Sequence, residues 1–584
     1  MPTLEWIGKD KVINHHQAVP YRVLKRVYSF DEQGQHEEDN GSRNMIIHGD
    51  NLEALKSLLP RYEGKIDCIY IDPPYNTGNE GWVYNDNVND PRIKKWLGEV
   101  VGKEGEDLSR HDKWLCMMYP RLQLLYRLLD DAGVIFISID DAECATLKLV
   151  CDEIFGANCF VSNVSWQRTY ATRNDSRGIV NEVEHILVYS KTPGWSPKKL
   201  SRTAEMDSIY KNPDNDVAPW TSADPCAPGA ATHQGMVYAI QHPITGKMIY
   251  PSIARCWTYG QDIVLEIMQR WAKYELRDLN DAENRAAVCG LAPDAVRADV
   301  KGIVLAEPLE EAQQHAQEVL RRGPWPKFYF TKNGKGGIRR KIYLEDVGGR
   351  LPTNLWLYED TGHTDEAKKE LRAVFGGATP FDTPKPSRLI EYLLQIAGNG
   401  NTLILDSFAG SGTTAHAVLN KNKADGGNRQ FILIELGDYA DAITAERVKR
   451  VISGYKKGVK AVEGTGGSFS FYELGERLLT EEGNLNEAVE LEQIRAYVWY
   501  METRTDIPSE ENGNPHFLGT HNDTAYYFFY EPTKVTVLNH DFLATIPEKK
   551  ETTVIYADRC TLAERTLTKY GIIFKKIPRD ITKL

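Results

Sequence analysis

The stretch DPPY, residues 72–75, places a carboxylate, two prolines and an aromatic ring directly after the apolar run CIYI. Proline has no N–H to donate to a sheet ladder, so Asp72, Pro73, Pro74 and Tyr75 must lie just past the end of a strand. Such a turn presents the Asp72 carboxylate beside the Pro73 carbonyl, and two adjacent acceptors can bind both hydrogens of an amine. The Tyr75 ring offers a face on which a base can stack. Taken alone, the stretch also fits a rigid turn with no chemical role.

A second candidate site is the glycine-rich run ILDSFAGSGTTAHAV, residues 404–418. Its glycines let the backbone approach a ligand closely at the start of an expected helix. The chain has no Gly-Lys-Ser or Gly-Lys-Thr tripeptide, as a phosphate-binding loop requires, and Ala415 replaces the third glycine of a dinucleotide fingerprint. Glu435 ends the next expected strand at about the 20-residue offset where an acid meets a ribose diol. The loop therefore favours an adenosine carried on a sulfonium over a ligand-free tight turn. The residues expected to bind it are Asp406, Phe408, Gly410, Gly412 and Glu435.

The elements that must position these residues alternate along the chain. Apolar runs predict strands at 44–50, 65–72, 133–140, 183–191, 401–406 and 429–436, and periodic runs predict helices at 51–59, 113–133, 142–156 and 413–420. This alternation is typical of an α/β fold with a doubly wound, mostly parallel sheet. The pattern stops near residue 195 and resumes near residue 355, which indicates an inserted domain. One long charged helical region is expected at 263–321, and an acidic helical piece at 475–494.

Composition indicates the compartment in which the protein works and the kinds of site that it lacks. The 584 residues contain nine scattered cysteines and no Cys-x-x-Cys pair, which favours free thiols over a disulfide frame or a zinc site, so no metal is expected. No apolar run approaches the roughly 18 residues of a membrane span. The start, MPTLEWIGKDKV, lacks an apolar signal core, and we expect a cytoplasmic protein. A net charge of −12 argues weakly against nucleic-acid binding unless a local basic cluster exists.

The two motifs together, in this order, resemble the β-type permutation of the DNA adenine-N6 methyltransferases. The stretches HGDNLEALKSL, DKWLCMMYPRL, GVIFISIDDAE, HILVYSK and TPKPSRLIEYLL resemble the modification subunits of type III restriction-modification systems. The resemblance implies a circularly permuted Rossmann-like sheet that uses S-adenosyl-L-methionine to methylate N6 of a flipped adenine in duplex DNA. Asp72 and the Pro73 carbonyl would bind the amine and Tyr75 would stack on its base. Asp50 would bind the cofactor's adenine, and Thr383 and Lys385 would lie at its methionine end.

The same resemblance assigns roles to segments of the chain. An N-terminal arm is expected at 1–43, the catalytic half of the methyltransferase domain at 44–195 and a target-recognition domain at 196–355. The cofactor half is expected at 356–455, and a small α/β module for assembly or partner binding at 456–584. A homodimer and an ATP-dependent restriction subunit are the expected protein partners.

A basic cluster that could bind double-stranded DNA occurs in the inserted segment. KFYFTKNGKGGIRRKIYL, residues 327–344, predicts a β-hairpin with cations around a glycine-rich turn, interleaved with aromatic residues. A solvated basic hairpin is the alternative. A second candidate is the loop WQRTYATRNDSRG, with Arg168 and Arg173. The cations of the hairpin are Lys327, Lys332, Lys335, Arg339, Arg340 and Lys341.

Three alternatives to this function stay open. Cytosine-N4 methylation needs the same acceptors, although that reaction more often carries Ser where Asp72 stands. A solitary adenine methyltransferase without a nuclease partner has the same motifs. A DNA-binding subunit with a vestigial pocket is the third, and the intact site residues argue against it.

Overall fold

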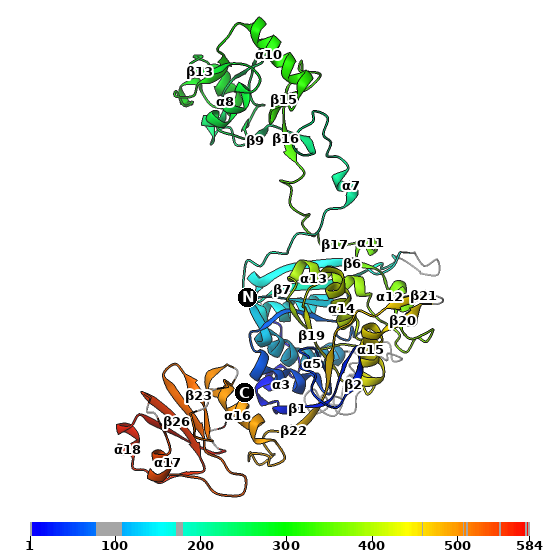
Figure 1. Ribbon diagram of the computed structural model, residues 1–584, viewed down its shortest axis with the longest axis vertical. Coiled ribbons are helices and arrows are strands. Elements are labelled where there is room, and N and C mark those ends of the chain that lie inside the picture. Colours follow the sequence, from blue (N-terminus) through cyan, green and yellow to red (C-terminus); the bar gives the residue numbers. More distant parts are fainter. Residues whose placement is uncertain are drawn as a thin grey trace. The chain divides into compact units, whose positions relative to one another are not determined.

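The computed structural model describes residues 3–76, 108–170, 179–457, 460–505, 507–509, 512–547, 550–578 and 581. The chain divides into two compact units, one formed by Met1–Lys198 with Pro352–Leu584 and the other by Lys199–Leu351. Figure 1 shows the elements of each. Among the described helices, none is long and apolar enough to cross a membrane.

An eleven-stranded sheet forms the centre of the larger unit in the part that the structure describes, in the order β17-β6-β7-β5-β4-β18-β19-β3-β22-β1-β2. Neighbours from β5 to β22 run parallel, whereas β7 and β1 pair antiparallel with their neighbours. The strands on the β4 side are β17 (Leu355–Trp356), β6 (Phe160–Gln167), β7 (Val183–Ser190), β5 (Leu129–Ile139) and β4 (Ile66–Ile71). The others are β18 (Leu403–Asp406), β19 (Gln430–Glu435), β3 (Met45–His48), β22 (Phe469–Arg477), β1 (Arg22–Asp31) and β2 (Gly34–His36).

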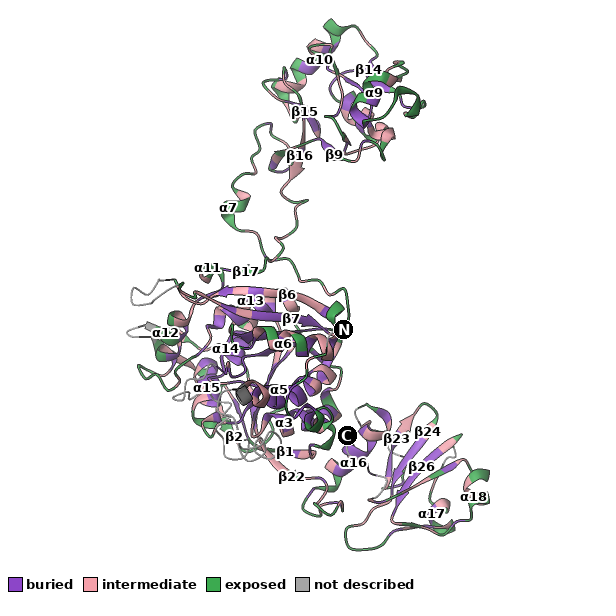
Figure 2. Cartoon of the chain, turned by 180° about the vertical axis from the view of Figure 1, so that it is seen from behind, coloured by how far each residue is buried: buried purple, intermediate pink, exposed green. Residues whose placement is uncertain are grey.

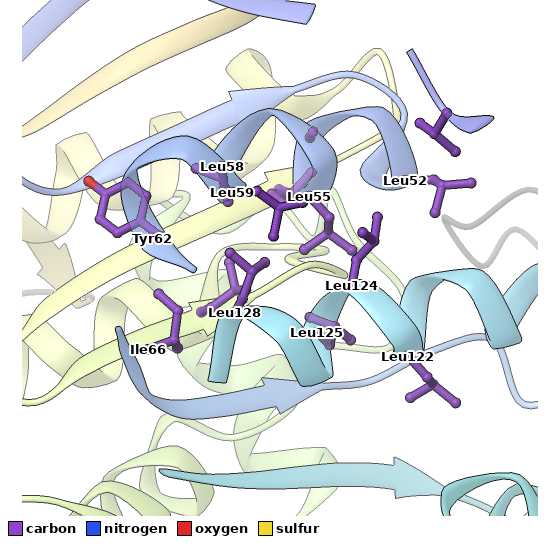
Figure 3. Close-up of a cluster of buried hydrophobic side chains, with 14 of the residues drawn as sticks. Leu52, Leu55, Leu58, Leu59, Tyr62, Ile66, Leu122, Leu124, Leu125 and Leu128 are labelled. Atoms are coloured by element: carbon purple, nitrogen blue, oxygen red, sulfur yellow. The ribbon is translucent and has the colours of Figure 1, made fainter. Parts of the chain in front are cut away.

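Helices cover both faces of this sheet, which is why its central strands are buried along nearly their whole length (Figure 2). Helices α3 (Asn51–Tyr62) and α5 (Leu108–Leu128) pack on each other with alternate residues of β3, β4 and β19. Helices α13 (Ser387–Ala397) and α14 (Thr413–Asp425) pack on each other, α13 also contacting β4 and α14 contacting β19. The predicted α/β fold with a mostly parallel, doubly wound sheet is therefore confirmed. The leucines that join α3 to α5 (Figure 3) are Leu52, Leu55, Leu58, Leu59, Leu122, Leu124, Leu125 and Leu128.

Several elements differ from those predicted. The helix expected to end at Gly133 ends at Leu128, and β5 starts at once. Gly133 lies where a side chain would meet the Asp130 and Ile66 carbonyl oxygens at 2.9 Å, so it serves a close strand approach and not a helix end. The segment expected as an N-terminal arm contributes β1 and β2 to the sheet, and β22, expected in a separate module, pairs with β3 and β1.

The region expected to be one long charged helix contains two strands. Helices α8 (Gln261–Gln269), α9 (Ala282–Cys289) and α10 (Leu309–Arg322) alternate with β13 (Tyr274–Arg277) and β14 (Gly302–Leu305). The strand β14 is completely buried, because it lies between β10 (Ile240–Gln241) and β13 in a four-stranded sheet. Tertiary burial of GIVL thus overrides the helical periodicity of its flanks.

The smaller unit also contains a three-stranded sheet of β15 (Phe328–Phe330), β16 (Ile338–Tyr343) and β8 (Trp220–Ala223). In the C-terminal part of the larger unit, α16 (Leu491–Thr503) precedes a sheet of β23 (Phe517–His521), β24 (Thr524–Phe528), β26 (Thr552–Ala557) and β28 (Ile572–Lys576). The acidic segment 479–490, expected to be helical, lies in turns, and the helix begins only at Leu491.

Candidate active site

The two sequence motifs meet at one edge of the central sheet. Strands β4 and β18 are parallel neighbours, with Cys68 opposite Ile404, so Asp72 and Asp406 lie at adjacent carboxyl ends. Glu435 ends β19, the next strand along. Ligands of open α/β sheets bind at this kind of edge. The residues lining the cavity here are Tyr70, Asp72, Phe381, Thr383, Pro384, Lys385, Asp406, Phe408, Ala409, Gly410, Ser411, Thr413, Thr414 and Glu435.

The glycine loop needs glycine at two positions. Gly410 and Gly412 have φ values of +51° and +78°, a region that side chains with a Cβ rarely adopt. A Cβ on Gly412 would lie 2.9 Å from the Thr444 carbonyl oxygen, so the loop packs tightly on the segment behind it. Asp406 accepts hydrogen bonds from the Phe408 amide (3.0 Å) and the Thr414 hydroxyl (2.5 Å), which fixes the start and end of the loop.

Two buried carboxyls flank the loop. Burial raises the pKa of Asp406 to about 7, against the hydrogen bonds from Thr414 and Phe408 that lower it. Burial likewise raises the pKa of Glu435 to about 7. Glu435 accepts from the Gly410 amide (2.7 Å), the Gly437 amide (2.8 Å) and the Tyr439 hydroxyl (2.6 Å). Both side chains can therefore change charge near neutral pH inside the cavity.

The Asp72 carboxylate is held by a lysine from the other half of the sheet. The Lys385 ammonium lies 2.6 and 2.7 Å from the two Asp72 oxygens and donates to the Tyr75 hydroxyl at 2.8 Å. Burial acts to lower the pKa of Lys385, but Asp72 and Glu184 outweigh it, so the pKa is raised and the side chain stays charged. We predicted that Lys385 would lie at the methionine end of the cofactor, and in this structure its ammonium binds Asp72.

Glu184 completes this cluster and was missed by the sequence analysis. The Tyr75 hydroxyl lies within hydrogen-bond distance of Asp72 Oδ1 (2.9 Å) and Glu184 Oε2 (3.0 Å), and Lys385 is 3.6 Å from Glu184. Arg168, predicted as a DNA contact, donates to Glu184 Oε1 at 2.9 Å and so belongs partly to the same cluster. Glu184 directly precedes HILVYSK, one of the stretches that carried the family resemblance. Its position beside that stretch was the signal that could have identified it as a site residue.

The turn after β4 is fixed from two sides. The Trp114 indole donates to the Pro74 carbonyl at 2.6 Å. Asn76, with φ of +56°, donates to Glu143, a fully buried carboxylate that His111 also contacts at 2.6 Å. The stiffness expected from two prolines is thus reinforced by α5 and by the segment that follows β5.

Support for the glycine loop comes from a buried arginine on α15 (Glu446–Ser453). Arg447 donates to the Ser411 hydroxyl (2.9 Å) and the Thr413 hydroxyl (2.8 Å), and it pairs with Glu370 at 3.0 Å. The Thr413 hydroxyl in turn donates to the Lys385 carbonyl at 3.2 Å. The glycine loop is therefore hydrogen-bonded to the segment TPKP, residues 383–386.

Asp50 lies at the end of β3 and caps α3, since its side chain accepts from the Leu52 amide at 2.8 Å. It lines a second cavity, which also contains His15, His48, Arg121 and Asp438. The sequence analysis grouped Asp50 with the other cofactor residues. In the structure it follows β3, the strand next to β19, on which Glu435 lies opposite His48.

The basic hairpin of the smaller unit is formed by β15 and β16. Lys332 and Lys335 are exposed at its turn, Arg339 contacts the Ser222 hydroxyl (3.1 Å), and Arg340 contacts the Asp224 carbonyl (3.0 Å). Lys327 is half-buried, 5.4 Å from the centre of the Tyr259 ring.

One cation of this hairpin requires a correction. Lys341 is completely buried and its ammonium pairs with Asp214 and with Asp216 (2.5 Å), so its charge is neutralised inside the unit and cannot contact a phosphate. The interleaved aromatic side chains of β15 are also buried in the core of the unit. Arg173 lies outside the described residues.

Comparisons of the sequence with known proteins identify one family. A family model described as DNA methylase matches residues 66–446. The StyLTI Mod subunit, a type III restriction-modification enzyme of Salmonella typhimurium, is 33% identical over 77% of this chain and 62% of its own length. The EcoP15I Mod subunit of Escherichia coli is 30% identical over 75% of this chain and 64% of its own length. This chain thus spans a little under two thirds of these relatives. The PvuII cytosine-N4-specific DNA methyltransferase structure matches with a TM-score of 0.31 and 13% identity, over 70% of this chain and 86% of that one.

Proposed function

The chain belongs to the DNA methylase family whose model spans residues 66–446, and from that premise we propose that it is a sequence-specific DNA methyltransferase. The reaction proposed is transfer of a methyl group from S-adenosyl-L-methionine to N6 of a flipped adenine in duplex DNA. The observation that carries the proposal is the convergence of Asp72, the first residue of DPPY, and the glycine loop on one cavity, at the ends of β4 and β18.

The residues present fit S-adenosyl-L-methionine. The glycine loop would admit the nucleoside at the start of α14, and ionised Glu435 would accept from a ribose diol. The cavity is lined by three carboxyl groups, those of Asp72, Asp406 and Glu435, and by one lysine, Lys385, so carboxylates outnumber cations there once Asp406 and Glu435 ionise, which suits a sulfonium cation. When bound, the cofactor supplies an electrophilic methyl group. Thr383 lines the same cavity, and it would lie at the methionine end of the cofactor.

The role of the chain is to hold and orient the amine. An exocyclic amine is a poor nucleophile because its lone pair is delocalised into the ring, and acceptors on both hydrogens draw the nitrogen toward tetrahedral geometry. Asp72 and the Pro73 carbonyl would be these acceptors. A carboxylate offers about four lone-pair sites, so Asp72 can accept from several donors at once, and in this structure Lys385 and Tyr75 are among them. Stacking on Tyr75, at about 1–3 kcal/mol per base, would partly offset the cost of extruding the adenine.

The rest of the chain is proposed to serve recognition and assembly. Residues 196–355 would recognise the target sequence, through exposed cations of the hairpin such as Lys332 and Lys335. Two of the relatives are type III Mod subunits, and on that basis we propose a homodimer that partners an ATP-dependent restriction subunit. Residues 456–584 would mediate these contacts.

The test is tritium transfer from labelled S-adenosyl-L-methionine to duplex DNA, followed by mass analysis of the methylated nucleoside. We expect N6-methyladenine from the wild type and none from Asp72→Ala. A matched control is Asp67→Asn, because Asp67 lies on the same strand but accepts from the Leu403 amide, away from the cavity. Full activity of Asp72→Ala would refute the mechanism, and N4-methylcytosine would assign the alternative reaction.

A further inference from the structure

A buried arginine on α5 lines the second cavity and contacts a residue that is hydrogen-bonded to the glycine loop. Arg121 is 3% exposed. Its Nε donates to the Asn51 side-chain oxygen at 2.5 Å, one terminal nitrogen donates to the Met117 carbonyl at 2.7 Å, and the other lies 3.7 Å from Asp50 Oδ2. The guanidinium is thus fixed by its own helix and directed at the first residues of α3.

The two residues that Arg121 contacts face different parts of the site. Asn51 donates to the carbonyl of Ser407 at 3.1 Å, and Ser407 is the first residue of the glycine loop. Asp50 uses Oδ1 to cap α3, and its side chain stays 27% exposed at the second cavity. Arg121 therefore contacts, through one planar group, both a side chain bonded to the glycine loop and, at ion-pair distance, the Asp50 carboxylate.

The two cavities are close enough for one nucleoside. The Gly49 amide donates to the Glu435 carbonyl at 2.9 Å, and β19 and β3 are parallel neighbours. Adjacent strands lie about 4.8 Å apart, which is less than the span of a nucleoside. A nucleoside with its ribose at Glu435 would place its base over the end of β3, beside Asp50.

We propose that Arg121 is a positioning residue that holds Asp50 so that Oδ2 accepts a hydrogen bond from the 6-amino group of the cofactor's adenine. This inference rests on the proposed function, because it requires an adenosine cofactor. A lysine would supply a charge but not the planar fork, so the orientation of Asp50 would be lost while the charge remained.

The experiment compares two probes, S-adenosylhomocysteine and its counterpart with hypoxanthine as the base, whose carbonyl cannot donate to Asp50. Binding of each is measured by calorimetry. A hydrogen bond to a charged group corresponds to a preference of about tenfold or more for the adenine form in the wild type. We expect Asp50→Asn and Arg121→Met to lose most of this preference and Arg121→Lys to lose part of it. Asn remains a good helix cap, so α3 should persist in Asp50→Asn.

The matched control is Arg127→Met, six positions along the same helix, where the arginine pairs with Glu63 away from both cavities. It should lower thermal stability and leave the adenine preference unchanged. If Arg121→Met and Arg121→Lys both keep the wild-type preference while Asp50→Asn loses it, the role of Arg121 is refuted and the cofactor assignment stands. If the wild type binds neither probe, the proposed function itself fails.

Discussion

Replacement of Lys385 by Met tests whether this lysine holds the Asp72 carboxylate in place as an amine acceptor. Lys385 is a partner of Asp72 at 2.6 and 2.7 Å, and both side chains are only 10% exposed. Removing one partner of a buried pair leaves an uncompensated charge and lowers the free energy of unfolding by about 3–5 kcal/mol. In the variant, Asp72 would lose its ammonium partner while the Glu184 carboxylate stays within hydrogen-bond distance of the same Tyr75 hydroxyl.

The consequence for activity is a lower kcat. The Lys385 ammonium contacts both Asp72 oxygens and the Tyr75 hydroxyl, so without it the amine acceptor and the stacking ring lose a shared partner. Misplacement of a reacting group by about 1 Å can cost about 100-fold in rate, so kcat for methyl transfer should fall by up to about that factor.

The assay is tritium transfer at saturating cofactor and DNA, together with thermal unfolding of each variant. Lys56→Met is the matched control, since Lys56 is fully buried in the same unit but donates to the His16 carbonyl at 3.0 Å and lies outside the cavity. It should lower stability without lowering kcat. A Lys385→Met enzyme that keeps the wild-type kcat would refute the reasoning, because the Asp72 carboxylate would then be held in place without its lysine.

Three further predictions concern neighbouring groups. Glu184→Gln should keep the fold and lower kcat more than it raises the KM for DNA, because it disturbs the Tyr75 hydroxyl; steady-state kinetics measures this, and an unchanged kcat would contradict it. Burial raises the pKa of Glu435 to about 7. Between about pH 4.5 and 7 this carboxyl therefore binds more protons in the folded protein than in the unfolded protein. Its contribution to the free energy of unfolding falls as pH rises through that window. Cofactor affinity should rise over the same window as the diol acceptor ionises, and Glu435→Gln should flatten both trends in calorimetry. Lys335→Ala should weaken DNA binding about equally across sequences and reduce the slope of log affinity against log salt concentration by about one, as measured by fluorescence anisotropy. Lys341→Ala should instead unfold the smaller unit, as measured by circular dichroism, because it removes the partner of two buried carboxylates.

The central sheet and the site edge were predictable because parallel strands align their carboxyl ends. The apolar runs before Asp72 and Asp406 indicated two buried strands, and the motif order indicated which lay in the same sheet. Boundaries were less accurate where packing overrides local pattern. Gly133 suggested a helix end, but it serves the close approach of β5 to the Ile66 carbonyl, a contact that no local sequence encodes.

Charge partners were the least predictable part of the site. Lys341 stands in a run of cations, yet Asp214 and Asp216, 127 and 125 residues away in sequence, neutralise it inside the unit. A buried lysine with two carboxylates and an exposed lysine at a hairpin turn have the same local sequence signal. The sequence therefore overstated how many cations of the hairpin can contact a phosphate backbone. Lys332 and Lys335 can do so, because the turn exposes them.

The arrangement of Asp72 and Lys385 connects the permuted order of the motifs to the chemistry. The two residues are 313 positions apart, on opposite sides of the inserted unit in the sequence, and they meet where β4 pairs with β18. Lys385 also contacts the glycine loop, because its carbonyl accepts from the Thr413 hydroxyl. The amine acceptor and the cofactor loop therefore share Lys385 as a partner. A displacement of this one residue would disturb both parts of the site, which ties the amine chemistry to the pairing of the two halves of the sheet.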